Sequence, residues 1–133
     1  FFVQREREEL LPQLMRMCAF DAVANNADRK GGHCLLDANG HIWGIDHGLC
    51  FHPAHKLRSV IWEWAGDEIP APLLADIEAA GLAIAAESDG AVPLLELLHE
   101  HESTAMLHRI ERLLRDRRYP VPGQARHYPW PMV

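Results

Sequence analysis

The chain has 133 residues, of which 48% are hydrophobic and 24% charged, and its formal net charge is −6. That length suits one domain with a core of its own, and the composition is that of an ordinary globular protein. The negative charge argues against non-specific nucleic-acid binding. No apolar run is long enough to span a bilayer, so we expect neither a transmembrane segment nor a signal peptide. The three cysteines form no C-x-x-C pair, which predicts free thiols and a cytoplasmic protein.

The first expected element is a helix from Glu6 to about Ala24, because apolar side chains recur there at near-helical spacing. Pro12 would either lie in its first turn or kink it. Asn25 and Asn26 would end the helix as cap and loop residues.

A β-hairpin over residues 34–45 follows, because two short apolar runs flank an Asn-Gly pair, which is a strong turn signal. Pairing the strands would bring the loop before the hairpin close to the residue after it. The loop offers Asp28, Lys30 and His33, and Asp46 follows the second strand. Two carboxylates, an imidazole and a lysine amine would therefore converge at one end of the hairpin.

More helices are expected after the hairpin, from the spacing of apolar residues. They cover residues 56–64, 70–87, 93–100 and a final stretch to Arg118 that Ser103 or a neighbour caps. The last helix would direct its apolar side chains inward and its arginines largely outward. Residues 119–133 are rich in proline, which predicts an extended, polyproline-like tail that is either mobile or laid over the surface.

The stretch of residues 25–51 resembles the active centre of the protein-kinase-like superfamily, and most closely that of phosphatidylinositol 3-/4-kinases and their bacterial relatives. In that family a catalytic loop D-R-H-x-x-N is followed by a strand, a turn, a second strand and D-F-G. This chain reads D-R-K-G-G-H from Asp28 to His33, then the hairpin, then D-H-G from Asp46 to Gly48. The spacing also fits the protein-kinase pattern D-x-x-x-x-N. In particular, the chain looks like an actinobacterial kinase-like family.

This resemblance implies an ATP-dependent phosphotransferase that uses Mg²⁺ or Mn²⁺. Asp28 would be the catalytic aspartate that accepts the proton of the attacking hydroxyl, and Asp46 would hold the metal against the nucleotide phosphates. The simpler alternative is that each of these aspartates is only a turn residue, because aspartate favours turns. Lys30 replaces the histidine of D-R-H and would either neutralise charge on the transferred phosphoryl group or be a solvated lysine.

His33 stands where the family has a second metal-ligand asparagine, and Mg²⁺ prefers oxygen ligands whereas imidazole suits softer metals. The change would favour Mn²⁺, weaken the second metal site, or mark a pseudokinase; otherwise His33 is a structural histidine. Arg29 would pair with a carboxylate beneath the loop. Lys56 and Arg58 would meet a substrate phosphate or form an exposed face.

The fold implied is mainly α with a small β-hairpin: the C-terminal lobe of a kinase-like fold over residues 1–118. Its parts are a catalytic loop 25–33, the hairpin 34–45, a DFG-like triplet 46–48 and a helical tail 53–118, with the Pro-rich tail 119–133 beyond. No glycine-rich loop or nucleotide-contacting lysine strand precedes the catalytic loop. We therefore expect the N-terminal lobe to belong to a longer protein and this fragment alone to be inactive.

Other readings remain beside the kinase. A pseudokinase or binding module is motivated by the replacements at Lys30, His33 and His47. A histidine-based metal protein is motivated by nine histidines, although neither H-E-x-x-H nor C-x-x-C is present. Under the kinase hypothesis the partners are a nucleotide and a phosphate acceptor, which the sequence leaves open between a lipid headgroup, a protein hydroxyl and a small molecule.

Overall fold

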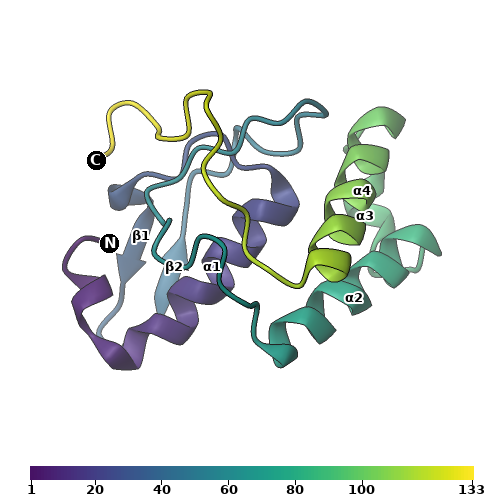
Figure 1. Ribbon diagram of the computed structural model, residues 1–133. Coiled ribbons are helices and arrows are strands. Elements are labelled where there is room, and N and C mark those ends of the chain that lie inside the picture. The colour runs from purple at the N-terminus through teal and green to yellow at the C-terminus, as the bar shows by residue number, and fades with distance from the viewer.

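The computed structural model describes all residues, 1–133, and is mainly helical with one small antiparallel sheet (Figure 1). This confirms the predicted class of a mostly α chain with a single β-hairpin. The helices are α1 (Leu11–Ala24), α2 (Ala71–Ala85), α3 (Val92–Leu95) and α4 (Glu100–Asp116). Figure 1 shows α1 and the hairpin on one side and the other three helices together on the opposite side. None of the helices has the length and apolar character needed to cross a membrane.

Helix α1 begins later than the sequence indicated, at Leu11 instead of Glu6, and two short 3₁₀ turns, Gln4–Glu6 and Glu8–Leu10, precede it. The reason is Pro12, which lies in the first turn, because its ring would clash with the carbonyl four residues upstream in a longer helix. Asn25 caps the end of the helix with a left-handed φ of 52°, a conformation asparagine adopts more readily than most residues.

The predicted hairpin is present as β1 (Cys34–Leu36) and β2 (Ile42–Gly44), paired antiparallel with Leu35 opposite Trp43. Alternate side chains face opposite ways, so Cys34 and Ile42 are buried while Leu35 and Trp43 are exposed. The Gln13 side chain on α1 donates to Gly40 O (2.7 Å) and accepts from the Ile42 amide (2.8 Å). That pair of hydrogen bonds fixes the turn end of the hairpin against the helix.

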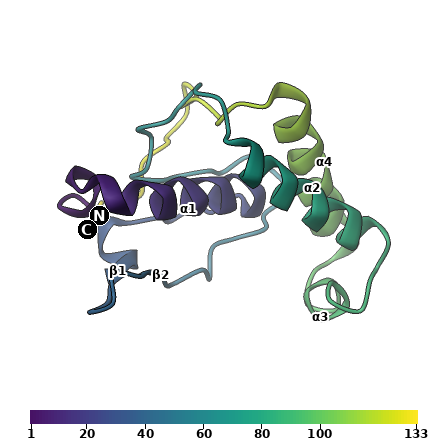
Figure 2. The ribbon, with the colours of Figure 1, turned by 90° about the horizontal axis from the view of Figure 1, so that it is seen from below.

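The expected helix at 56–64 does not form: the chain is extended around Ser59, which bridges to Arg29, and enters a turn at Glu63. Its backbone bonds to the loop before the hairpin: Arg29 N–H donates to Arg58 O and Val60 N–H to Arg29 O, both at 3.0 Å. Leu57, Val60 and Ile61 are buried by this arrangement. The apolar spacing fitted a helix, but long-range hydrogen bonds and the β-branched pair Val60-Ile61 favour extended backbone. Figure 2 shows α1 between the hairpin on one side and this segment and the tail on the other.

The helical unit is built by α2 packed on α4, with the short α3 between them in sequence. The predicted helix 70–87 is observed as α2, but the one predicted at 93–100 is only the short α3, and turn residues separate it from α4, which starts at Glu100. The expectation that Ser103 or a neighbour caps the last helix places the cap too late in the chain, because the helix starts at Glu100 and its N-cap is His99. Instead, the Glu102 carboxylate accepts a hydrogen bond from the His99 amide (2.8 Å), while the Ser103 hydroxyl donates to Glu100 O.

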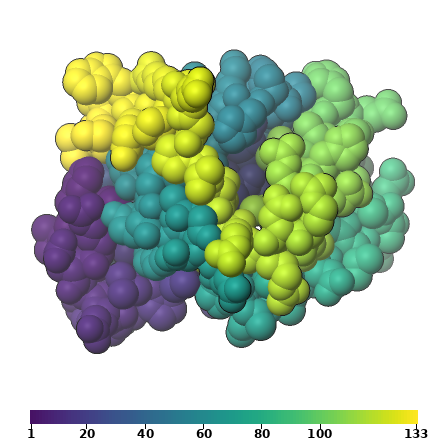
Figure 3. Space-filling view, in the orientation of Figure 1, coloured from purple at the N-terminus to yellow at the C-terminus, as the bar shows by residue number.

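Residues 119–133 form no helix or strand and lie over the surface (Figure 3). Tyr119 is buried, and its hydroxyl donates to Met15 O (3.2 Å). Farther along, His127 O accepts from the Ser59 amide (3.0 Å), and Met132 O accepts from the Gly31 amide (2.8 Å). The tail therefore holds both the extended segment and the loop before the hairpin.

Candidate functional site

The loop 25–33 rests on a buried ion pair. Arg29 and Asp21 have side chains that are 0% and 1% exposed, and the guanidinium donates to both carboxylate oxygens at 2.9 Å. Bidentate geometry of this kind offsets the cost of taking two charges out of water. The prediction that Arg29 pairs with a carboxylate beneath the loop is confirmed, and α1 supplies the partner.

Two asparagines make the loop rigid. Asn26 donates to the Asp21 carboxylate (2.9 Å) and accepts from the Asp28 amide (3.0 Å). Asn25 donates to His52 O and to Ala54 O, at 2.7 and 2.8 Å, which ties the loop to the chain after the hairpin. Both asparagines are fully buried. Sequence reasoning treated them only as cap and loop residues and missed this bracing role, for which adjacent asparagines at a helix end were the sole signal.

Asp28, His33 and Asp46 come together as the hairpin predicted. One ligand atom from each lies within 4.8 Å of the other two, and no other trio of histidine, cysteine or acidic side chains in the chain does this. His33 Nε2 is 3.4 Å from the Asp46 carboxylate, and Lys30 Nζ is 3.3 Å from that of Asp28. The Asp46 side chain is 63% exposed whereas those of Asp28 and His33 are 20% and 13% exposed. The cluster is therefore anchored on the loop and open toward Asp46.

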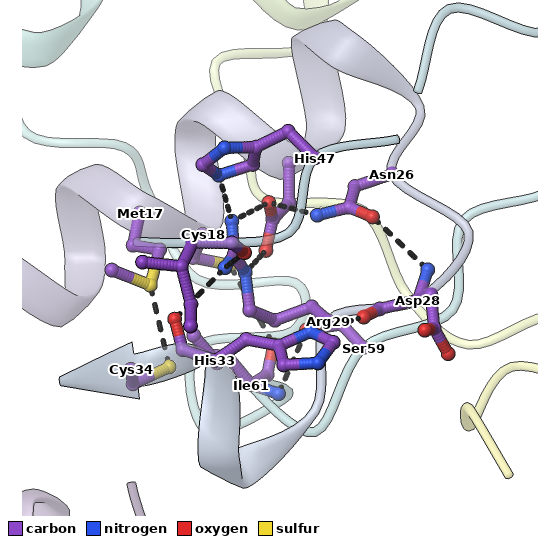
Figure 4. A network of polar contacts seen from close by, with 12 residues as sticks. Met17, Cys18, Asn26, Asp28, Arg29, His33, Cys34, His47, Ser59 and Ile61 are labelled. Carbon is purple, nitrogen blue, oxygen red and sulfur yellow. Dashed lines mark hydrogen bonds and ion pairs between the residues drawn. The ribbon is translucent and has the colours of Figure 1, made fainter. Parts of the chain in front are cut away.

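The orientation of His33 decides which of its nitrogens can bind a metal. His33 Nδ1 lies 2.9 Å from Asp28 O (Figure 4), and a backbone carbonyl only accepts hydrogen bonds. In the neutral imidazole, Nδ1 therefore carries the proton and Nε2 keeps the lone pair, on the side that faces Asp46. Fixing the tautomer through the second nitrogen is how proteins prepare histidine ligands.

His47 has a different role from its neighbours. Its Nε2 lies 2.8 Å from Arg29 Nη2, and because a guanidinium only donates, the imidazole accepts (Figure 4). Burial lowers the pKa of His47, and the Arg29 charge lowers it further. The ring also stacks edge-on against Phe20, with 5.2 Å between centroids. His47 thus anchors the end of the hairpin and is not a ligand of the cluster.

The remaining candidates lie outside the cluster. The backbone amide of Lys56 donates to the Asn25 side chain, the Lys56 side chain is exposed, and Arg58 is half-buried.

Gly31 and Gly32 form part of a 3₁₀ turn, Gly31–His33, and a Cβ on Gly31 would lie 2.8 Å from the Phe2 ring. The predicted free thiols are confirmed as free cysteines.

The hairpin carries an exposed apolar surface that sequence reasoning missed. Leu35, Trp43 and Ile45 are 47%, 55% and 40% exposed on the outer face of the hairpin. Ile45 directly precedes Asp46, and Leu35 follows His33 by two residues. A two-stranded hairpin can bury only one face, so the alternation of side chains was the signal that could have predicted it.

Comparison with known proteins gives one relative. The chain is 43% identical over 119 residues to the protein Rv2133c of Mycobacterium tuberculosis, an alignment that covers 90% of this chain and 42% of that protein. The chain thus spans about two fifths of the length of the curated relative it matches. No family model matches the chain, and no solved structure matches it either. The name of the relative states no activity, so a function has to be argued from the site.

Proposed function

We propose that the chain is the C-terminal lobe of a phosphatidylinositol 3-/4-kinase-like phosphotransferase that binds ATP with a divalent metal. The observation that supports this most is the convergence of Asp28, His33 and Asp46 at the end of a hairpin. Their order along the chain, with the loop first, the hairpin next and the second acid last, is the order of the kinase motifs.

The donor atoms fit a divalent cation. Two carboxylates supply the hard oxygens that Mg²⁺ and Mn²⁺ prefer, and the free Nε2 of His33 adds a nitrogen that favours Mn²⁺. The exposure of Asp46 leaves room beside the site for phosphate oxygens. A bound cation would neutralise the charge of the nucleotide phosphates. Lys30, which already lies 3.3 Å from Asp28, would add positive charge at the same place.

The apolar surface of Leu35, Trp43 and Ile45 suits the flat, apolar face of a nucleotide base. Ile45 directly precedes Asp46 in the chain, and in this proposal the base lies on the apolar surface while the phosphates reach the metal cluster. Asp28 would then orient and deprotonate the acceptor hydroxyl, which belongs to a lipid headgroup, a protein or a small molecule. In this proposal another lobe, outside these residues, covers the phosphates.

A binding module without catalysis is the second candidate, and one contact favours it. The Asp28 carboxylate already pairs with Lys30, so an acceptor hydroxyl would have to compete with the lysine for it. The histidine-based metal protein has less support, because His41, His52 and His55 join no cluster of ligands.

The test is calorimetric titration of the chain with Mn²⁺ and Mg²⁺. We expect saturable binding that is tighter for Mn²⁺ and at least about tenfold weaker in Asp46→Asn, which loses an anionic ligand. Asp76→Asn, an equal charge change on an exposed face of α2, is the matched control and should bind as the wild type does. Absence of binding to either metal would contradict the proposed site.

Catalysis is tested in a protein that carries both lobes. We expect ATP turnover that Asp28→Ala abolishes, while the 133 residues alone transfer no phosphate. Metal-dependent ATP binding without turnover would leave the binding module as the function.

A further inference from the structure

A polar cavity lies between α4 and the chain just after the hairpin, and none of its residues is in the metal cluster. It measures about 150 Å³. Its lining consists of Pro53, His55, Ala105, His108, Arg109 and Arg112. A smaller cavity beside it shares His55, Arg109 and Arg112. None of these residues belongs to the Asp28–His33–Asp46 cluster.

The charges in this cavity have one sign only. No acidic residue lines either cavity, and neither Arg109 nor Arg112 forms an ion pair anywhere in the chain. Near the end of α4, Arg115 pairs with Asp116 and Arg118 with Glu68, whereas Arg117 forms no ion pair. The cavity therefore holds two positive charges without a counter-charge, in a chain whose net charge is −6.

Arg109 is fixed by two hydrogen bonds, and one of its guanidinium nitrogens has no acceptor. Its Nε donates to Val23 O (2.8 Å) and its Nη1 to His52 O (3.4 Å). Its Nη2 is buried and has no hydrogen-bond partner. A desolvated cation with an unfilled donor is costly unless an anion accompanies it. Burial lowers the pKa of Arg109 and of His55, and Arg112 lowers both further.

We propose that this cavity binds a phosphate-type oxyanion through Arg109 and Arg112, with His55 and His108 at its edges. Planar guanidinium groups match the oxygens of phosphate, and hydrogen bonds between opposite charges are the strong ones. Liquid water takes ~30 Å³ per molecule, so the cavity has room for an ion of five heavy atoms. The anion is either free phosphate or the phosphate group of a larger ester.

The experiment titrates the full chain with inorganic phosphate and, separately, with glycerol 3-phosphate, at low salt and matched ionic strength. The variant is Arg112→Gln, because Arg112 is exposed and donates no hydrogen bond that would hold the fold together. Arg115→Gln removes the same charge from the same helix outside the cavity and is the matched control. We expect Arg112→Gln to weaken binding at least about tenfold and Arg115→Gln less than about twofold.

Two readouts separate the outcomes. Tighter binding of glycerol 3-phosphate than of phosphate would identify an ester as the ligand, and equal or weaker binding would identify the free ion. On binding, the pKa of His55 followed by NMR should rise, because an anion opposes the lowering by Arg112 and Arg109. No saturable binding, or equal losses in Arg112→Gln and Arg115→Gln, would overturn the proposal in favour of diffuse surface attraction.

Discussion

The guanidinium of Arg29 is the point where three parts of the candidate site meet. Besides the two bonds to Asp21 on α1, its Nη1 donates to His33 O (3.3 Å) and Ile45 O (3.4 Å), and its Nη2 reaches His47. Those carbonyls belong to one cluster residue and to the neighbour of another. The spacing between His33 and Asp46 is therefore set by a buried side chain that is itself no part of the cluster.

Replacing Arg29 with methionine should destabilise the chain by about 3–5 kcal/mol, because the Asp21 carboxylate would stay buried without its cation. Urea unfolding followed by circular dichroism measures the change. The double variant Asp21→Leu/Arg29→Met removes both charges and should lose less than Arg29→Met alone. A free energy of unfolding for Arg29→Met within 1 kcal/mol of wild type, on the order of a surface substitution, would show that the pair is unimportant.

A second prediction concerns Cys50, the most exposed of the three cysteines. Burial raises the pKa of Cys50 to about 11, so at neutral pH the group is a thiol, and only the thiolate is a nucleophile. Alkylation of Cys50 by iodoacetamide at pH 8 should be at least ~100-fold slower in the folded chain than in urea. The folded rate should rise about tenfold per pH unit up to about pH 10, since thiolate accumulates below the pKa. Mass spectrometry of quenched samples gives both rates, and equal rates at pH 8 would refute the burial of this thiol.

Among the elements, α2 and α4 approach each other closely at one glycine. A Cβ on Gly81 would lie 2.8 Å from Ile110 Cγ2, and Ile110 is 2% exposed, so it has little room to move. This contact explains a glycine in the middle of a helix, where it costs ~1 kcal/mol relative to alanine.

Gly81→Ala should therefore destabilise the chain by about 1–2 kcal/mol, because the strain of overpacking exceeds the gain in helix propensity. In an Ile110→Ala background, where the contact is gone, the same change should be neutral or stabilising. Thermal unfolding of the four chains of this double-mutant cycle measures the coupling. Additive effects would mean that the helices adjust without strain.

Some helices and strands could be predicted from the sequence and others could not, depending on whether their signals are local. The hairpin and α1 carry local signals, the Asn-Gly turn and Pro12, that act within a few residues. The stretch 56–64 has apolar residues at helical spacing, but its backbone forms hydrogen bonds to Arg29 and to the tail instead of within a helix. Likewise the convergence of Asp28, His33 and Asp46 followed from pairing two strands, whereas Asp21 as the partner of Arg29 depended on packing that no local pattern encodes.

Over the whole molecule, the loop of the candidate site is held by segments far from it in sequence. The Gly31 amide bonds to Met132, and the Ser59 amide, in the segment paired with Arg29, bonds to His127. The tail is thus a structural part of the site, although it contributes no ligand.

Deleting residues 120–133 should accelerate hydrogen exchange at the amides of Gly31 and Ser59 by at least about tenfold, because both lose their acceptors. Amides within α2 serve as the internal control and should keep their protection. NMR measurement of amide exchange in the full chain and in the truncated chain tests this prediction. Unchanged protection of Gly31 and Ser59 would mean that other groups hold the loop.

The bond between Gly31 and Met132 also has a consequence for synthesis of the protein on the ribosome. At ~5–20 residues per second, the carbonyl that accepts from Gly31 is made ~5–20 s after Gly31 itself. Helix α1 and the hairpin, which Gln13 joins, have time to form within that interval. A nascent chain would therefore display its apolar hairpin face and a loosely held loop first, and the arrangement of Asp28, His33 and Asp46 would settle last.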